Sequence, residues 1–382
     1  MTIAAPVRAG LVALTLGVAL AGCSATDVSS PGGEGCPSGA ASAPNSPEVG
    51  ADGSATLRLG ARGAIMVTAK GDFGEVALTK DACGVWTATT SPLEPGIYSY
   101  FFSVDGATLA DPANPDNKGS SESLLTIPGD PPMAWEVQDV PRGAITRVTY
   151  ESAVVGSVRP YVVYTPPGYE DDSAPLPVLY LLHGYSDNEE SWLDTGKAGV
   201  IADNLLADGL IEPMIIVMPY GQRSPDVTPY EGVGPGFREI FETELLTEII
   251  PAVERDFRVV PDARHRAIAG LSMGGMEAAL IGLNHPEVFS TVAMWSAAVV
   301  DDPASILTRL AGLSDEAKAS FRYVQLAVGT EDDLMGRSNV LGAYLTAQGV
   351  RIDYRATPGT HSWLLWRSHL ADFLPQFSAI AE

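Results

Sequence analysis

The stretch Ala267-Ile268-Ala269-Gly270-Leu271-Ser272-Met273-Gly274-Gly275 decides how the rest of the chain is interpreted. It opens with apolar residues typical of a β-strand, and Met276 to Leu280 after it has the composition of a helix. Between them stands Gly-x-Ser-x-Gly, the pattern in which a serine lies on a sharp turn from strand to helix. Larger side chains at the glycine positions would collide with the strand and the helix. We therefore expect Ser272 to present its hydroxyl as a nucleophile.

The same turn offers backbone N–H groups that can hold a negatively charged oxygen. The N–H of Met273 lies at the start of the helix, where a developing oxyanion is favoured. A second donor is expected in His183-Gly184-Tyr185, directly after the strand Val178 to Leu182, because Gly184 lets the backbone turn. We expect the N–H groups of Met273 and Tyr185 to form an oxyanion hole, with a structural role for His183.

Length and composition describe an ordinary globular chain with an acidic surface. The 382 residues suffice for two domains, and 46% hydrophobic with 18% charged residues is not the composition of a disordered chain. The formal net charge is −24, from 47 acidic against 23 basic residues. This balance argues against nucleic acid or an anionic membrane surface as a partner. It fits a soluble extracellular protein.

The N-terminus has the features of an export signal. Arg8 is the only charged residue before Cys23, and the apolar run Leu11 to Ala21 is too short to span a membrane. The run ends in Leu20-Ala21-Gly22-Cys23, which resembles the lipobox of bacterial lipoproteins, where the cysteine is lipid-modified and becomes the first residue. The resemblance predicts an exported protein anchored through Cys23 to the outer face of the bacterial cell membrane. Secretion after an ordinary signal peptide is the alternative.

Two cysteines remain, Cys36 and Cys83. In an exported protein such a pair is more often a disulfide than two free thiols, so we expect them to be bonded. The histidines and cysteines lack the spacing of metal ligands. We therefore expect no metal site and no organic cofactor.

Changes in composition divide the chain into five parts. Residues 1–22 form the predicted lipoprotein signal peptide, and residues 23–50, rich in Ser, Gly, Ala and Pro, predict a flexible tether. Short alternating runs separated by turn dipeptides predict a small all-β sandwich at 51–128. The Pro- and Asp-rich residues 129–140 read as a linker to the last part, 141–382.

The last part alternates strand and helix patterns. Val178 to Leu182 and residues 214–218 are continuous apolar runs, which indicate strands covered on both faces. The alternation predicts an α/β fold, the doubly wound, mostly parallel sheet of the α/β-hydrolases, preceded by the small all-β sandwich. The other expected strands lie at 147–150, 160–164, 267–269, 290–294, 323–328 and 351–356, and the expected helices at 200–209, 239–257, 276–280, 338–349 and 368–377.

Elimination among the five histidines identifies the expected base. A serine hydroxyl needs a base to take its proton, and the base needs an acid to orient it. His183 precedes the serine, His265 lies at an exposed turn, His285 at a helix stop and His369 on the terminal helix. His361 lies in the loop between the last strand and that helix, where the order serine, acid, histidine of the α/β-hydrolases places the base.

The acid should follow the strand at 323–328. The candidates in Gly329-Thr330-Glu331-Asp332-Asp333 are three consecutive acidic residues. Acidic residues directly after a strand often only lie in solvated turns, and we expect this for two of the three. We choose Asp332, and Asp333 stays open as the alternative.

The region from about residue 141 to 380 resembles the esterase D and feruloyl esterase family, which also includes siderophore esterases and mycolyltransferases. In its feruloyl esterases a Gly-Thr-Asx/Glu-Asp turn after the late strand carries the acid, which implies Asp332. The segments that carry the resemblance are Tyr164-Thr165-Pro166-Pro167-Gly168-Tyr169, Tyr180-Leu181-Leu182-His183-Gly184, Ile201-Ala202-Asp203-Asn204-Leu205, Ala267 to Gly275, and His361-Ser362-Trp363 with Trp366-Arg367.

The β-rich part resembles the early-set, glycogen-binding type of immunoglobulin-like domain. The resemblance rests on Leu93 to Tyr100, Val104-Asp105-Gly106 and Asp111-Pro112. Such domains bind α-glucans through exposed tryptophans with a lysine and an asparagine. Trp86 is the only tryptophan here and stands at a strand position, so we expect it in the core and the domain in a structural or docking role. The domain's place before the hydrolase part resembles the layout of secreted esterases of the family.

Together these features imply a serine carboxylic-ester hydrolase that works through a Ser-His-Asp triad and an acyl-enzyme. The expected substrate is an extracellular small-molecule or polysaccharide-linked ester, such as a feruloyl, acetyl-sugar or siderophore ester. The alternatives are acyl transfer to a sugar, as in the mycolyltransferases, and a non-catalytic cell-surface binding protein on an inactive hydrolase. Five side chains could line the acyl pocket or belong to the core: Trp192, Tyr220, Trp295, Met335 and Trp363.

Overall fold

The computed structural model describes residues 45–118, 121–221, 235–299 and 301–381. One compact unit covers Ala41–Glu382. Cys23 and Cys36, together with the predicted signal peptide, lie outside the described residues. Among the helices of the described part, none is long and apolar enough to cross a membrane.

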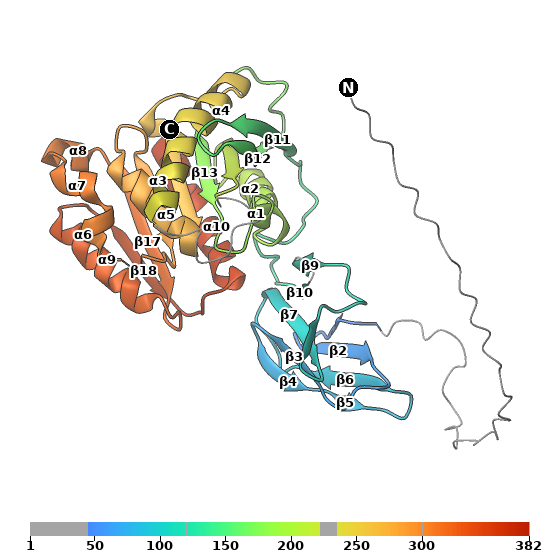
Figure 1. Ribbon diagram of the computed structural model, residues 1–382. Coiled ribbons are helices and arrows are strands. Elements are labelled where there is room, and N and C mark those ends of the chain that lie inside the picture. Colours follow the sequence, from blue (N-terminus) through green and yellow to red (C-terminus); the bar gives the residue numbers. More distant parts are fainter. Residues whose placement is uncertain (1–44, 119–120, 222–234, 300, 382) are drawn as a thin grey trace, which may run out of the picture. The chain divides into compact units, whose positions relative to one another are not determined.

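Two antiparallel sheets form a β-sandwich in the first part of the described chain (Figure 1). One sheet has the strand order β1-β2-β6-β5, and the other has the order β4-β3-β7-β10-β9 with β8 paired to β7. The strands are β1 Glu48–Val49, β2 Ala55–Gly60, β3 Val67–Gly71, β4 Gly74–Ala77, β5 Thr79–Lys80, β6 Val85–Thr89, β7 Gly96–Val104, β8 Ala107–Leu109, β9 Asn117–Lys118 and β10 Glu122–Ile127.

Alternate residues of these strands meet in one apolar core. Leu57 and Leu59 of β2 face Tyr100 and Phe102 of β7, as the two-residue period of a strand requires. Trp86 belongs to the same core, and its indole N–H donates to the Ala61 carbonyl at 2.8 Å. Its predicted core position is confirmed. The assignment of the sandwich to the early-set type stays a prediction.

The second part of the chain contains an eight-stranded sheet with the order β11-β12-β14-β13-β15-β16-β17-β18. The pairs β11–β12 and β12–β14 are antiparallel, and all later pairs are parallel. A mixed, mostly parallel sheet is therefore confirmed. Its strands are β11 Ala144–Ser152, β12 Ser157–Thr165, β13 Val178–Leu182, β14 Ile215–Pro219, β15 Arg266–Leu271, β16 Thr291–Trp295, β17 Tyr323–Gly329 and β18 Asp353–Thr357.

Helices cover both faces of this sheet (Figure 1). Helices α3, α4, α5, α7 and α9 pack on one face, and α1, α2 and α10 on the other. The helical segments are α1 Ser191–Asp194, α2 Ala198–Ala207, α3 Pro235–Glu244, η1 Leu245–Ile249, α4 Ile250–Asp256, η2 Ala263–His265, α5 Ser272–Asn284, α6 Pro303–Ile306, α7 Thr308–Gly312, α8 Asp315–Ala319, α9 Met335–Ala347 and α10 Trp363–Ala381.

The central strands are apolar throughout because both of their faces are buried. In β13, Tyr180 and Leu182 join the core under α5, whereas Leu179 and Leu181 join the core under α2 and α10. The continuous apolar run at 178–182 thus has the cause inferred from the sequence. Two features differ from expectation: the helix at 239–257 contains a π-helical segment, η1, and the short helices α1 and α6 to α8 have no counterpart among the expected helices.

The β-sandwich contacts the helix α10 through a buried arginine. Arg367 donates from Nη1 to the Ile97 carbonyl of β7 and from Nε to the Thr195 carbonyl, both at 2.7 Å. Its side chain is fully buried, and burial lowers the pKa of Arg367 to about 9. Ile97 and Leu124 also join the apolar cluster beneath α10. The predicted limits of the domains and the linker stay predictions.

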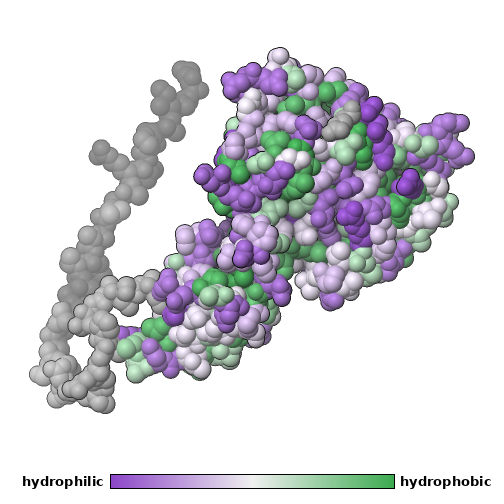
Figure 2. All heavy atoms as spheres, turned by 180° about the vertical axis from the view of Figure 1, so that it is seen from behind, coloured by the Kyte–Doolittle hydropathy of each residue, from purple (hydrophilic) through white to green (hydrophobic). Residues whose placement is uncertain are grey.

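Apolar side chains on the surface are scattered. Figure 2 shows hydrophilic and hydrophobic residues interspersed over one face of the molecule. The most exposed large apolar side chains are Ile65, Val137 and Val158, which come from separate segments of the chain. Scattered apolar residues of this kind are normal for a protein surface and point to no particular partner.

Candidate active site

The turn from β15 to α5 is built as the Gly-x-Ser-x-Gly pattern requires. Ser272 is the first residue of α5 and has a φ of +50°, an uncommon conformation for a residue with a side chain. A Cβ atom at Gly270 would lie 2.4 Å from the Gly274 carbonyl oxygen, and one at Gly274 would lie 2.4 Å from the His183 carbonyl oxygen. Only glycine fits at both positions. The strained turn places Ser272 at the end of the sheet.

Three predicted residues meet at this turn. The His361 Nε2 atom lies 3.0 Å from the Ser272 Oγ atom. On the other side of the ring, His361 Nδ1 lies 2.9 and 3.1 Å from the two carboxylate oxygens of Asp332. Residues 272, 332 and 361 follow the ends of β15, β17 and β18, respectively. The chain of hydrogen bonds is the arrangement in which a serine hydroxyl can pass its proton to an imidazole.

The carboxylate of Asp332 is buried and accepts several hydrogen bonds. Burial by itself raises its pKa, but hydrogen bonds from His361, from the Ser296 hydroxyl and from the Leu334 N–H outweigh burial and hold the pKa of Asp332 below its usual value. The group is therefore ionised at neutral pH. Asp333, the alternative acid, is exposed, and its neighbour Asp332 makes the contact with His361.

The loops that carry Asp332 and His361 are fastened to each other. The Thr330 N–H donates to the Thr357 carbonyl at 2.8 Å, and the Gly359 N–H donates to the Glu331 carboxylate at 2.6 Å. A Cβ atom at Gly329 would lie 2.0 Å from the Gly359 carbonyl oxygen, so the two backbones touch. This contact fixes the distance between the acid and the histidine.

Two residues beyond the predicted set support the acid and the histidine. Ser296 follows β16, and with a φ of +47° its hydroxyl reaches Asp332. The indole N–H of Trp366 donates to Ser296 Oγ at 3.1 Å. The Trp366 ring also stands edge-on to the His361 ring, 4.8 Å between centroids at 88°. A serine after an apolar strand gives no sequence signal for this role, and the only sequence signal at Trp366 is its place in a family motif.

The loop after β13 lies beside the serine. A Cβ atom at Gly184 would lie 3.6 Å from Ser272 Cβ. His183 Nε2 accepts from the Gly221 N–H at 3.1 Å, so Nδ1 carries the proton donated to the Gly184 carbonyl at 2.8 Å. Burial lowers the pKa of His183 to about 4, and the ring stays neutral. Its two hydrogen bonds hold the loop that carries Tyr185.

The five side chains named as candidates for the pocket have different surroundings. Trp192 and Trp295 are fully buried, and their rings pack edge to face with centroids 5.6 Å apart. These two side chains therefore belong to the core and not to an open pocket. Trp363 lines the pocket at Ser272. Tyr220 lies over the His183 ring at 5.9 Å. Met335 is half-buried at the start of α9.

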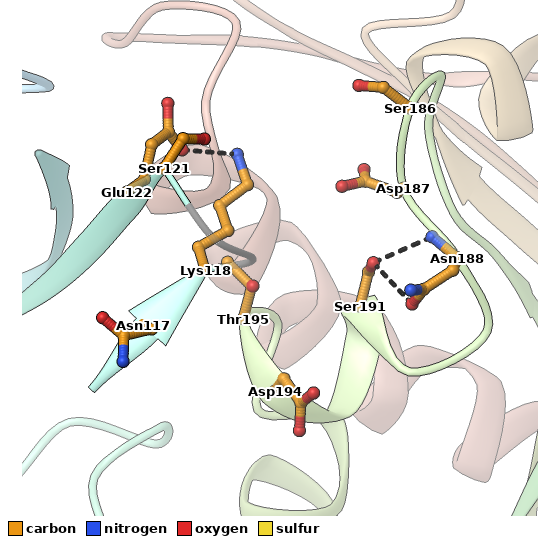
Figure 3. A pocket seen from close by; sticks show the side chains of 10 residues that line it. All are labelled: Asn117, Lys118, Ser121, Glu122, Ser186, Asp187, Asn188, Ser191, Asp194 and Thr195. Atoms are coloured by element: carbon orange, nitrogen blue, oxygen red, sulfur yellow. Dashed lines mark hydrogen bonds and ion pairs between the residues drawn. The ribbon is translucent and has the colours of Figure 1, made fainter. Parts of the chain in front are cut away.

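Two adjoining pockets open at the site. The first, about 410 Å³, lies in front of Ser272 and His361 and is bounded by Leu271, Trp363 and Trp366. The second, about 520 Å³, is shown in Figure 3. Its lining is almost entirely polar and comes from β9 and β10 on one side and the segment from Ser186 to Thr195 on the other. Residues shared by both pockets are Lys118, Glu122, Ser186 and Asp187.

Side chains that could ligate a metal are not grouped in the described part of the chain. No cluster of three His, Cys, Asp or Glu residues there could hold a metal ion.

Comparison with known proteins identifies the family. The esterase family model, described as "Putative esterase", matches residues 152–377. An endo-1,4-beta-xylanase/feruloyl esterase of Xylanibacter ruminicola is 35% identical over 338 residues, which are 84% of this chain and 44% of that protein. An acetyl esterase of Caldicellulosiruptor saccharolyticus is 24% identical, over 55% of this chain and 86% of that protein. The chain thus spans less than half the length of the first of these relatives.

Solved structures agree with the family model. A ferulic acid esterase is 31% identical with a TM-score of 0.56, covering 63% of this chain and 99% of that one. The enterobactin esterase of Shigella flexneri is 19% identical with a TM-score of 0.65, covering 85% and 93%, a likeness of fold. With the family model spanning more than half of its residues, the chain belongs to the esterase family of feruloyl esterase-like α/β-hydrolases, a family of carboxylic-ester hydrolases.

Proposed function

We propose that the protein is a serine carboxylic-ester hydrolase with Ser272 as nucleophile, His361 as general base and Asp332 as the orienting acid. One observation supports this most directly: His361 bridges the other two, 3.0 Å from the Ser272 hydroxyl and 2.9 Å from the Asp332 carboxylate. The lowered pKa of Asp332 keeps a negative charge behind the imidazole. This charge fixes the tautomer with the proton on Nδ1 and stabilises the imidazolium formed during the reaction.

Acylation follows from this arrangement. The Ser272 Oγ attacks the ester carbonyl carbon while its proton moves to His361 Nε2, and the carbonyl oxygen becomes an oxyanion. The N–H groups of Met273 and Tyr185 hold that oxyanion. When the tetrahedral intermediate collapses, the bond to the alcohol oxygen breaks and the alcohol leaves with the proton from His361 Nε2. The acyl group stays bonded to Ser272.

Deacylation repeats these steps with water. His361 Nε2 takes a proton from a water molecule, whose oxygen attacks the acyl carbon and forms a second oxyanion. Collapse breaks the bond to Ser272 Oγ, which regains its proton from His361. The products are a carboxylic acid, an alcohol and the free enzyme. If a sugar hydroxyl replaced water, the same site would carry out acyl transfer.

The substrate is proposed to be an extracellular ester of the feruloyl, acetyl-sugar or siderophore type. Relatives named as feruloyl, acetyl and enterobactin esterases support this range. Trp363 and Trp366 at the pocket in front of Ser272 offer apolar surface for an acyl group. The adjoining polar pocket (Figure 3) suits a hydroxylated part of the same molecule.

Export and attachment to the membrane complete the proposal. Cys23 would carry the lipid and residues 24–50 would form the tether. Cys83 is disulfide-bonded, which supports an oxidising compartment. Its pairing with Cys36 is part of the proposal, because Cys36 lies outside the described residues.

Replacement of the nucleophile tests the proposed function. Ser272→Ala should lower esterase activity by on the order of 10³ or more in a folded protein, because the attacking atom is gone. The measurement is kcat/KM on aryl esters of acetate, butyrate, ferulate and longer acids, with and without trehalose as acceptor. A fluorophosphonate should label the wild-type serine and not the variant. Near wild-type turnover by Ser272→Ala would refute the assignment, and lack of labelling of the wild type would favour a non-catalytic protein.

A further inference from the structure

The polar pocket of Figure 3 and the pocket at Ser272 share four lining residues, one of which is Asp187. Asp187 lies in the loop after β13, on the wall opposite the β-sandwich. The facing wall carries Lys118 of β9 and Glu122 of β10, which form an ion pair at 3.1 Å. A group held in the polar pocket would therefore lie next to Asp187 as well as near the reacting serine.

Asp187 is also bonded to the backbone that carries the proposed oxyanion donor. The Gly184 N–H donates to the Asp187 carboxylate, and the Asp187 N–H donates to the Gly184 carbonyl at 3.3 Å. A Cβ atom at Gly184 would lie 3.2 Å from Asp187 Oδ2 and 3.6 Å from Ser272 Cβ. The Asp187 N–H thus holds the Gly184–Tyr185 peptide, and the carboxylate holds the preceding His183–Gly184 peptide, within a short distance of the nucleophile. A shift of the Gly184–Tyr185 peptide would move the Tyr185 N–H.

We propose that Asp187 is a positioning and specificity-determining residue, which holds the Gly184-Tyr185 backbone in place for the oxyanion and accepts a hydroxyl of a substrate group seated in the polar pocket. The inference rests on the proposed function. Asp187 acts on the reacting atoms through the oxyanion loop and touches only the remote part of the substrate. Binding of that part of the substrate and stabilisation of the oxyanion therefore both depend on Asp187.

The lining of the pocket favours hydroxyl groups over anionic ones. Three carboxylates line the pocket, those of Asp187, Glu122 and Asp194, together with one ammonium group, that of Lys118. An anionic substrate group would be repelled by this excess of negative charge, whereas a hydroxyl can donate to a carboxylate and accept from Lys118. Burial raises the pKa of Asp187 to about 6, an effect that Lys118 opposes and Glu122 reinforces. Above that pH Asp187 is a charged acceptor held away from bulk water.

Two substitutions of Asp187 separate its two roles. Asp187→Ala removes both the bond to the Gly184 N–H and the acceptor in the pocket. It should lower kcat by about tenfold or more on every ester, phenyl acetate included, because the loss of one oxyanion donor costs 10²- to 10³-fold and a displaced donor costs part of that. In Asp187→Asn the amide oxygen can still accept from the Gly184 N–H. This variant should recover most of the lost kcat.

The loss of charge in Asp187→Asn should instead raise KM. KM for a hydroxylated ester should rise about tenfold, the value of one hydrogen bond to a charged group, with a smaller rise for its unhydroxylated partner. Two pairs of esters test which part of the substrate carries the hydroxyl: a glycosyl acetate against ethyl acetate for the alcohol part, and methyl ferulate against methyl cinnamate for the acyl part. The pair whose difference in KM becomes smaller in the variant identifies the part that contacts Asp187. Asp171→Asn, at an exposed turn, controls for the loss of one negative charge.

The possible results separate this inference from the proposed function. Fluorophosphonate labelling of Ser272 in each variant reports whether the nucleophile is intact. If Ser272 is labelled and Asp187→Ala keeps wild-type kcat, the positioning role is wrong while the hydrolase assignment stands. Equal losses of kcat in the Ala and Asn variants would also overturn it, because Asn preserves the acceptor. Unchanged discrimination in both substrate pairs would refute the hydroxyl site.

Discussion

Asp332 and Asp333 are adjacent in the chain, yet their surroundings differ completely. Asp332 is buried and bonded to His361, whereas Asp333 is exposed. Asp332→Asn keeps the shape of the side chain but removes the charge that fixes the histidine tautomer, a change that costs about 10⁴ in rate in a related triad. We expect a loss of at least about 10² in kcat/KM on one aryl ester, with little change in Tm.

The neighbouring residue supplies a matched control. Asp333→Asn removes the same charge one position further along, at an exposed site next to the same loop. Its kcat/KM should fall by less than about tenfold, as expected for a surface substitution. A severe loss in Asp333→Asn with a mild one in Asp332→Asn would mean that the acid is Asp333. Mild losses in both would place the acid on another strand.

Single residues of the site differ in how far the sequence predicts them. Ser272 and His361 have strong signals, a glycine-framed turn and a place in chain order, and the structure brings both side chains together with Asp332. Ser296 has none, because its role depends on a hydrogen bond between segments 70 residues apart, and Trp366 has only its place in a family motif. The role of side chains that hydrogen-bond to catalytic residues depends on tertiary contacts. Hydrophobic periodicity and motif spacing in the sequence do not reveal such contacts.

At the level of elements, a buried ion pair joins β12 to α3. Arg159 and Glu244 are almost completely buried and form two hydrogen bonds, at 2.8 and 3.1 Å, and the Tyr150 hydroxyl adds a third to Glu244 at 2.6 Å. Arg159→Met would leave the Glu244 carboxylate buried without its cation. We expect the free energy of unfolding to fall by about 3–5 kcal/mol, measured by denaturant titration.

An exposed ion pair of the same chemistry serves as the comparison. Arg147 donates twice to Glu190, but its side chain is 63% exposed. Arg147→Met should cost less than about 1 kcal/mol, because water and salt screen such a pair. Similar losses in Arg147→Met and Arg159→Met would show that burial does not decide the strength of these pairs.

The elements that the sequence predicts well are those with two buried faces or strict alternation. The runs at 178–182 and 323–328 lie within one residue of β13 and β17, since a strand covered on both sides must be apolar throughout. The helices α6 to α8 are four or five residues each, too short for a 3.6-residue period to be recognised. The sequence does not reveal the π-helical η1, because its apolar residues continue the pattern of α3 and α4.

At the level of the whole molecule, two buried histidines make the fold sensitive to acid. Burial lowers the pKa of both His183 and His369 to about 4, against about 6.5 for an exposed histidine. The unfolded chain therefore binds a proton at a higher pH than the folded one. The stability that each neutral ring contributes is complete above about pH 6.5 and is lost as the pH falls toward 4, by up to about 3 kcal/mol for each histidine.

Comparison with His369→Gln isolates this contribution from the other titrating groups. Asp187, with its raised pKa, has the opposite sign, since its contribution is greatest below about pH 4 and is lost as the pH rises through about 6. The difference between wild type and variant cancels the contribution of Asp187.

The unfolding free energy, measured from pH 8 to pH 4, should fall less steeply in His369→Gln below pH 6.5, by up to about 1.4 kcal/mol per pH unit. A constant offset would report only altered packing, because packing has no protons to exchange. Parallel curves across the whole range would therefore contradict a neutral, acid-titrating His369, and a steeper fall in the variant would contradict the sign of its pKa shift.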